Sequence, residues 1–198
     1  MGAAASSQLA EVVLVRHGRR MPTASVSSRD DGWIRTSTKP AGAKPAAVYC
    51  SNMRRAVQTA EPIAAASGAP LVIEPNLTEM HAGAFQGRNK GQVKRSQDFK
   101  AFIRGGRDQP IPGGGESFNQ LSERCVSCLN AITKKHMGER VVVVSHEQVI
   151  REICRHANPM GSSGREFPNA SISVVHISVS DGRWILEEIG DVQHLDRR

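Results

Sequence analysis

Aromatic residues, cysteines and long apolar runs are scarce in this chain of 198 residues, and each scarcity excludes a class of protein. Phe, Trp and Tyr make up only 4% of the residues, which is too few for the stacking platforms that bind single-stranded nucleic acid. No apolar run approaches the ~20 residues of a membrane span, so a transmembrane protein is excluded. Four cysteines are too few for a disulfide scaffold of this size. A reducing, cytoplasmic location is therefore expected.

The remaining composition predicts one globular domain over residues 1–198, because 39% of the residues are hydrophobic and 23% are charged. The first six residues fit the loose M-G-x-x-x-S pattern for N-myristoylation. Stable anchoring needs a second signal, and no basic residue follows until Arg16. No charged start followed by an apolar stretch marks a signal peptide. We therefore expect no membrane attachment.

Positive charge is concentrated in one part of the chain. The net charge is +7, and residues 16–55 alone carry nine basic and two acidic residues, so the rest of the chain sums to zero. A local excess of this kind suits an anionic ligand. With so few aromatic residues, a compact phosphate-like anion is favoured over nucleic acid.

Runs rich in Val and Ile alternate with helical patterns along the chain. The predicted strands are residues 12–15, 46–49, 71–73, 141–144, 172–179 and 184–189. The predicted helices are residues 54–66, 116–136 and 147–156, and Pro62 should kink or break the first of them. Continuous apolar strands between helices are typical of a mostly parallel sheet that is covered on both faces. We predict an α/β fold, a three-layer α/β/α sandwich.

Two segments show neither the alternation of apolar residues typical of a strand nor the three-to-four-residue spacing typical of a helix. Residues 19–44 contain few large apolar side chains, and we predict that this segment is poorly ordered. Residues 105–115 form a Gly/Pro loop of a length that is usually functional or mobile.

Chemistry-bearing residues follow two of the predicted strands. Arg16, His17 and Gly18 come directly after residues 12–15, and His146 comes after residues 141–144. Side chains just past the carboxyl ends of parallel strands share one crevice when the strands are neighbours, which chain order alone does not establish. A single strand-end histidine is usually a hydrogen-bonded structural residue. Two histidines with an arginine favour phosphoryl transfer through histidine, with Gly18 allowing close backbone approach.

The Cys125-x-x-Cys128 pair lies on the apolar stripe of the predicted helix 116–136 and has no second pair. Core packing is therefore predicted over a zinc or redox role, and no metal or other cofactor is expected.

Five segments of the chain carry the resemblance to a known family. They are Arg16-His17-Gly18, SNMRRAVQTA (51–60), LTEMHAGAFQG (77–87), PGGGESF (112–118) and SHEQVIR (145–151). In this order they resemble the motifs of the histidine phosphatase superfamily, also called phosphoglycerate mutase-like. The chain is most similar to plant members, some of which are metal-independent phosphoserine phosphatases.

The resemblance implies a residue-level mechanism and a substrate class. His17 would become phosphohistidine and Glu79 would protonate the leaving group. Arg16, Gly18, Arg55 and His146 would bind the phosphoryl group, while Arg54 would be solvated. It implies hydrolysis of a small phosphorylated metabolite without a metal, and it leaves a homo-oligomer open. Hydrolysis is preferred over mutase activity because mutases tend to carry longer insertions.

The chain departs from the family pattern at two places. Arg19 to Pro22 replace residues that normally help to bind phosphate, and Glu147-Gln148 stand where Gly-Gly is usual. A carboxylate at Glu147 would compete with phosphate if it pointed inward and would cost nothing if it pointed outward. Two alternatives therefore remain, a catalytically impaired paralogue that binds phosphorylated ligands and a mutase-type phosphotransferase.

Overall fold

The structure is a computed structural model that describes residues 9–18, 44–161 and 164–195, so the segment predicted to be poorly ordered lies outside the described residues apart from Lys44. Six strands form one sheet in the order β3-β2-β4-β1-β5-β6. They are β1 (Leu9–Arg16), β2 (Ala47–Cys50), β3 (Leu71–Ile73), β4 (Arg140–Ser145), β5 (Ile172–Ser178) and β6 (Trp184–Asp191). β1 to β4 are parallel, and β5 and β6 are antiparallel to their neighbours. All six predicted strands are present.

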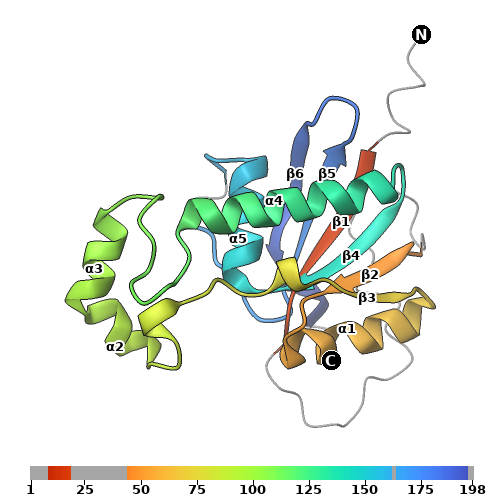
Figure 1. Ribbon diagram of the computed structural model, residues 1–198. Coiled ribbons are helices and arrows are strands. Elements are labelled where there is room, and N and C mark those ends of the chain that lie inside the picture. The colour runs from red at the N-terminus through yellow and green to blue at the C-terminus, as the bar shows by residue number, and fades with distance from the viewer. Residues whose placement is uncertain (1–8, 19–43, 162–163, 196–198) are drawn as a thin grey trace.

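Helices cover both faces of this sheet, as Figure 1 shows. They are α1 (Arg54–Ser67), α2 (Lys90–Arg95), α3 (Gln97–Arg104), α4 (Phe118–Lys135) and α5 (Glu147–Ala157). α4 and α5 pack on one face and α1 packs on the other, which confirms the three-layer prediction. Of the kink or break expected at Pro62, the break is absent, because α1 continues to Ser67. The carbonyl that Pro62 leaves without a helical donor belongs to the exposed Gln58, where water can bind it.

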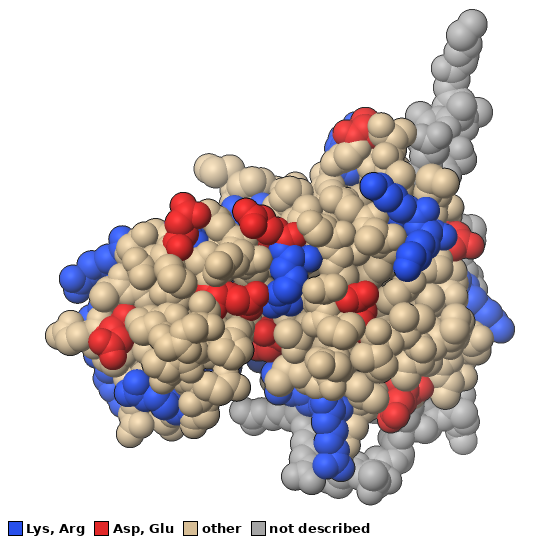
Figure 2. Space-filling model, in the orientation of Figure 1, with Lys and Arg blue, Asp and Glu red and all other residues tan. Residues whose placement is uncertain are grey.

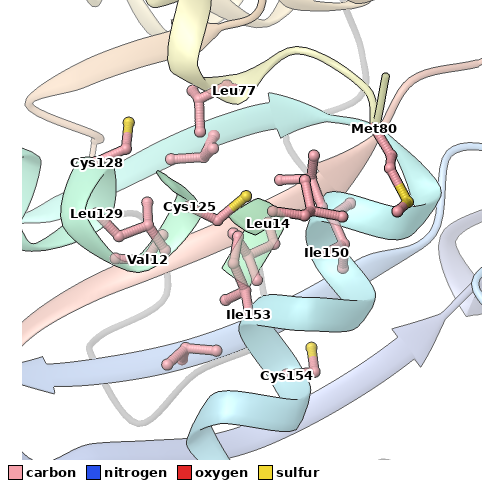
Figure 3. Packing of buried hydrophobic residues seen from close by; sticks show 14 of the residues in the cluster. Val12, Leu14, Leu77, Met80, Cys125, Cys128, Leu129, Ile150, Ile153 and Cys154 are labelled. Atoms are coloured by element: carbon pink, nitrogen blue, oxygen red, sulfur yellow. The ribbon is translucent and has the colours of Figure 1, made fainter. Parts of the chain in front are cut away.

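Alternate residues of the central strands point into two separate apolar clusters. On the α4–α5 face, Val12 and Leu14 pack against Leu129 and Ile150 (Figure 3). Cys125 and Cys128 are buried in the same cluster, and burial raises the pKa of each thiol to about 12. Both cysteines are therefore neutral core residues, as predicted. No described helix is long and apolar enough to cross a membrane.

A small lobe made of α2 and α3 stands at one end of the molecule (Figure 1) and was not predicted. The side chains of Asn89 and Ser96 cap the two helices by accepting hydrogen bonds from backbone amides. The rings of Phe99 and Phe102 on α3 pack against each other and against those of Phe85 and Phe118. The Gly/Pro loop that follows is tied to α5, because Arg107 forms a salt bridge with the buried carboxylate of Glu152.

Charged side chains of both signs are interspersed over the face shown in Figure 2. The predicted concentration of positive charge belongs largely to residues 19–43, which hold five of its nine basic residues and lie outside the described ranges. The predicted positive field therefore stays a prediction.

One buried ion pair crosses the central strands. The Glu11 carboxylate on β1 lies 2.8 Å from Nε of Arg140, its register partner on β4, and both side chains are almost fully buried. Glu11→Gln leaves the buried guanidinium without this carboxylate, so we expect the free energy of unfolding to fall by about 3–5 kcal/mol in urea denaturation. Glu61→Gln, which makes the same change on an exposed part of α1, should alter it by less than ~0.5 kcal/mol. Equal stabilities for the two variants would contradict this prediction.

Candidate active site

β1 and β4 are parallel neighbours, and their carboxyl ends bring two histidines together. Arg16 is in register with Ser145, and the His17 backbone N–H donates to the Ser145 carbonyl at 2.9 Å. The imidazole rings of His17 and His146 lie with their centroids 5.0 Å apart. The adjacency that chain order could not establish is thus present.

The hydrogen bonds of His17 define which ring nitrogen is available. Nδ1 lies 2.8 Å from the carbonyl oxygen of Gly18, which can only accept, so Nδ1 carries the proton. Nε2 in turn accepts from Nε–H of Arg55 at 3.0 Å. The Asn169 side chain donates to the His17 carbonyl at 2.9 Å and fixes the backbone at this point. His17 is therefore held as the tautomer whose Nε2 lone pair faces the site.

Arg55, in the first turn of α1, lies between the two histidines. Its Nε–H also approaches Nδ1 of His146 at 3.3 Å, so that nitrogen is an acceptor. The other His146 nitrogen, Nε2, then donates to Oγ of Ser51 at 2.7 Å. Among the described residues Arg55 forms no salt bridge, whereas the neighbouring Arg54 is exposed, as expected. The terminal nitrogens of Arg55 are thus available to an anion.

Both histidines are held neutral. Burial, followed by the positive charge of Arg55, lowers the pKa of the fully buried His146 to about 3. Burial also lowers the pKa of His17, with Arg55, Arg16 and Lys90 acting in the same direction against the hydrogen bond to Gly18. A neutral imidazole is the form that can attack phosphorus.

Glu79 follows the short helical turn Pro75–Leu77 and belongs to the same site. Its Oε1 accepts from the Met80 backbone N–H at 3.0 Å. Burial raises the pKa of this carboxyl, and the nearby Glu147 charge adds to the effect, although Arg55 and two backbone amides oppose it. A raised pKa suits a group that must donate a proton.

The PGGGES segment holds the Glu79 segment in place. The Glu116 carboxylate accepts from the His81 backbone N–H at 2.8 Å and pairs with both Nε and Nη2 of Arg124, each at 2.9 Å. Arg124 donates from Nη1 to the Thr78 carbonyl at 3.1 Å. Glu116 and Arg124 therefore clamp the backbone on both sides of Glu79.

Arg16 is engaged with the protein rather than open to solvent. Its Nη1 donates to the Phe167 carbonyl, and its Nη2 lies 3.1 Å from a carboxylate oxygen of Glu147. Of the two orientations that the sequence left open for Glu147, the structure has the inward one. The Glu147 carboxylate therefore pairs with the Arg16 guanidinium, which the family resemblance implied would bind phosphate.

Four further residues support the site without belonging to the predicted set. Ser51 bonds to His146, Thr59 accepts from the Gly18 amide, and Asn169 donates to the His17 carbonyl. Lys90 is near enough to lower the pKa of His17. Ser51 and Thr59 lie inside the SNMRRAVQTA motif, where their motif positions could have identified them. Asn169 and Lys90 had no such signal. Among the residues that the structure describes, an added Cβ at Gly18 would meet only Oγ1 of Thr59, at 3.8 Å, so their packing does not demand glycine there.

Within the described ranges, no group of three or more His, Cys, Asp or Glu side chains is arranged to hold a metal ion.

Comparison with known proteins gives consistent matches. The family model of the histidine phosphatase superfamily (branch 1) matches residues 35–192, a range that begins after Arg16-His17-Gly18. A metal-independent phosphoserine phosphatase of Arabidopsis thaliana is 40% identical, over 96% of this chain and 84% of its own length. Phosphoglycerate mutase-like protein 4 of the same plant is 35% identical, over 94% and 87%.

Solved structures agree on the fold. YhfR of Bacillus stearothermophilus superimposes with a TM-score of 0.72 at 23% identity, covering 94% of this chain and 99% of that one. A phosphoserine phosphatase of Entamoeba histolytica, in complex with 3-phosphoglyceric acid, gives a TM-score of 0.71 at 19% identity over 94% and 99%. The predicted fold class is thereby confirmed.

Proposed function

Because this chain belongs to the histidine phosphatase superfamily (branch 1), we propose that it hydrolyses a small phosphomonoester through a phosphohistidine on His17, without a metal. The observation that carries the proposal is the position of Arg55. This partly buried guanidinium uses Nε to contact two neutral imidazoles, and its terminal nitrogens have no carboxylate partner among the described residues. A phosphoryl group placed there would bring the negative charge that Arg55 lacks as a partner. Its phosphorus would also lie close to the Nε2 lone pair of His17.

In the first step Arg55 releases its hydrogen bond to Nε2 of His17 as it binds the phosphoryl oxygens, the freed lone pair attacks phosphorus, and the ester P–O bond breaks. The leaving oxygen takes its proton from Glu79, whose raised pKa keeps that proton available. Arg55 and Arg16 stabilise the charge on the phosphoryl oxygens. His146 stays neutral and orients Arg55 through Nδ1.

In the second step the Glu79 carboxylate takes a proton from water, which attacks phosphorus. The P–N bond breaks, its electron pair returns to Nε2 of His17, and inorganic phosphate leaves. Nδ1 remains bound to the Gly18 carbonyl, so the same tautomer is regenerated.

Phosphoserine is the substrate that we propose to test first. The support is the 40% identity to a plant phosphoserine phosphatase, together with Lys90, an exposed cation close enough to His17 to lower its pKa. Lys90 offers a partner for the substrate carboxylate once the phosphoryl group is in place.

The experiment that tests the proposal is hydrolysis of phosphoserine and of a generic aryl phosphate in the presence of EDTA. We expect phosphate release from both, with a rate that EDTA lowers by less than about twofold, since the proposed steps use only protein groups. Mass spectrometry of samples quenched rapidly with denaturant at alkaline pH, where the P–N bond of phosphohistidine survives, should show one phosphate on the peptide that contains His17.

Three outcomes would overturn the proposal. Activity that EDTA abolishes and Mg²⁺ restores would indicate a different chemistry. Transfer of the phosphoryl group between two positions of phosphoglycerate, without release to water, would favour the mutase alternative. Phosphate binding without any turnover would favour the impaired paralogue, the reading that the inward Glu147 supports.

A further inference from the structure

The Glu147 carboxylate lies between two arginines at the edge of the candidate site. Oε2 is 3.1 Å from Nη2 of Arg16, and Oε1 is 3.4 Å from Nη2 of Arg151, one turn further along α5. All three side chains are partly exposed, with Arg16 the most buried at 15%. The carboxylate therefore bridges the two guanidinium groups, and it still has a partner in Arg151 if it gives up Arg16.

The contact with Arg16 leaves part of that guanidinium unsatisfied. Nη1 donates to the Phe167 carbonyl and Nη2 meets Glu147, but Nε is buried and has no hydrogen-bond partner among the residues that the structure describes. A single carboxylate oxygen on Nη2 does not reach Nε. An anion that presents two oxygens to the Nε–Nη2 edge would satisfy both donors, and a phosphoryl group has that geometry.

Arg151 is also held in place by contacts other than its pairing with Glu147. Its Nη1 donates to the Arg165 carbonyl at 2.9 Å, and its guanidinium stacks over the Phe167 ring at 5.1 Å from the centroid. These contacts do not involve Glu147, so they hold Arg151 in place whichever partner the carboxylate has. The spacing from Glu147 to Arg151 is i to i+4 on α5, with the acid first, which is the favourable order on a helix.

We propose that Glu147 is an internal competitor for the phosphate site, a carboxylate that bridges Arg16 and Arg151 when the site is empty and keeps only Arg151 when phosphate binds. The proposal rests on the proposed function in assigning Arg16 to phosphate. Its consequence is that Glu147 weakens the binding of the product phosphate and returns to Arg16 as phosphate leaves. Arg151 has the opposite influence, because it stabilises the position in which Glu147 leaves Arg16 free.

Isothermal titration with inorganic phosphate, at a mildly alkaline pH where phosphate is a dianion, tests this without turnover. Glu147→Gln removes the competitor, so the Kd for phosphate should fall by roughly tenfold, where each tenfold corresponds to about 1.4 kcal/mol. Arg151→Gln removes the alternative partner, so the Kd should rise by about threefold. Glu123→Gln, a matched change on an exposed part of α4, should leave it unchanged.

The double variant distinguishes this account from an indirect effect through Phe167. In Glu147→Gln/Arg151→Gln the Kd should equal that of Glu147→Gln alone within about twofold, because Arg151 acts only through Glu147. If Arg151→Gln weakens binding equally in both backgrounds, its effect passes through Phe167 and the proposal is wrong. Equal affinities of the parent and Glu147→Gln, including no binding by either, would also overturn it. Turnover of the parent with no change of Kd in Glu147→Gln would refute the competitor while leaving the proposed function intact.

Discussion

Replacing His17 by asparagine is expected to abolish phosphomonoester hydrolysis, with a fall in kcat of at least ~10⁴-fold. The amide nitrogen of asparagine has no basic lone pair, so no covalent phosphoryl intermediate can form. Arg55 keeps its charge in this variant, and phosphate binding by titration should survive within about tenfold. Steady-state assays and the quenched-sample mass spectrum check the two halves of the prediction.

His156→Asn is the matched control for the His17 variant. His156 lies on α5, packs against Trp184 and is exposed to solvent, so its replacement should leave kcat unchanged. Equal urea midpoints for the two variants would show that His17→Asn is folded. If His17→Asn retained a tenth of the parental kcat, the nucleophile would have to be another group.

Glu79→Gln is expected to lower kcat/KM by about 10²- to 10⁴-fold for an alkyl phosphate such as phosphoserine. The effect should be much smaller for an aryl phosphate, because its leaving oxygen departs without needing a proton. Since burial raises the pKa of Glu79, the protonated form is lost as pH rises through that raised value. The parental kcat/KM for phosphoserine should therefore decline on the alkaline side, and this limb should be absent in Glu79→Gln.

The pKa shift also predicts the stability of this variant. A carboxyl whose pKa is raised by folding is deprotonated more readily in the unfolded chain, so it lowers stability at pH values above its unfolded pKa. Glu79→Gln removes this cost, and its free energy of unfolding at neutral pH should be at least that of the parent. A less stable variant, or an equal loss of kcat/KM for both leaving-group classes, would contradict the assignment of Glu79 as proton donor.

Much of the fold could be predicted because the central strands are buried on both faces. The runs at residues 12–15 and 141–144 are apolar without interruption, which distinguishes them from surface strands. The α2–α3 lobe escaped prediction because its two helices have only six and eight residues, which is too short to show a helical period. Its start signals were nevertheless present in Asn89 and Ser96, both of which cap a helix.

The residues of the candidate site that could be predicted are those that lie in the five sequence motifs. Arg16, His17, Arg55, Glu79 and His146 lie in one constellation, linked by hydrogen bonds, ring contacts or short-range electrostatic effects. Sequence could not say that Glu147 turns inward, because a helix-start carboxylate is favourable in either orientation. The inward position depends on a long-range contact, because the partner that attracts Glu147 is Arg16, 131 residues earlier in the chain.

His17 and Glu79, the proposed nucleophile and proton donor, lie in parts of the molecule that differ in how readily they unfold locally. His17 follows β1, which is flanked by β4 and β5 and buried along most of its length, so its amide hydrogens should exchange with solvent only when the whole domain unfolds. Glu79 lies in an irregular segment whose clamp consists of the Glu116 and Arg124 hydrogen bonds, and such segments open locally. Mild denaturant should therefore release Glu79 while His17 and Arg55 stay in place. In that range the protein would still take up phosphate and still form the phosphohistidine from aryl phosphates, but it would have lost its activity on alkyl phosphates well before any spectroscopic sign of unfolding.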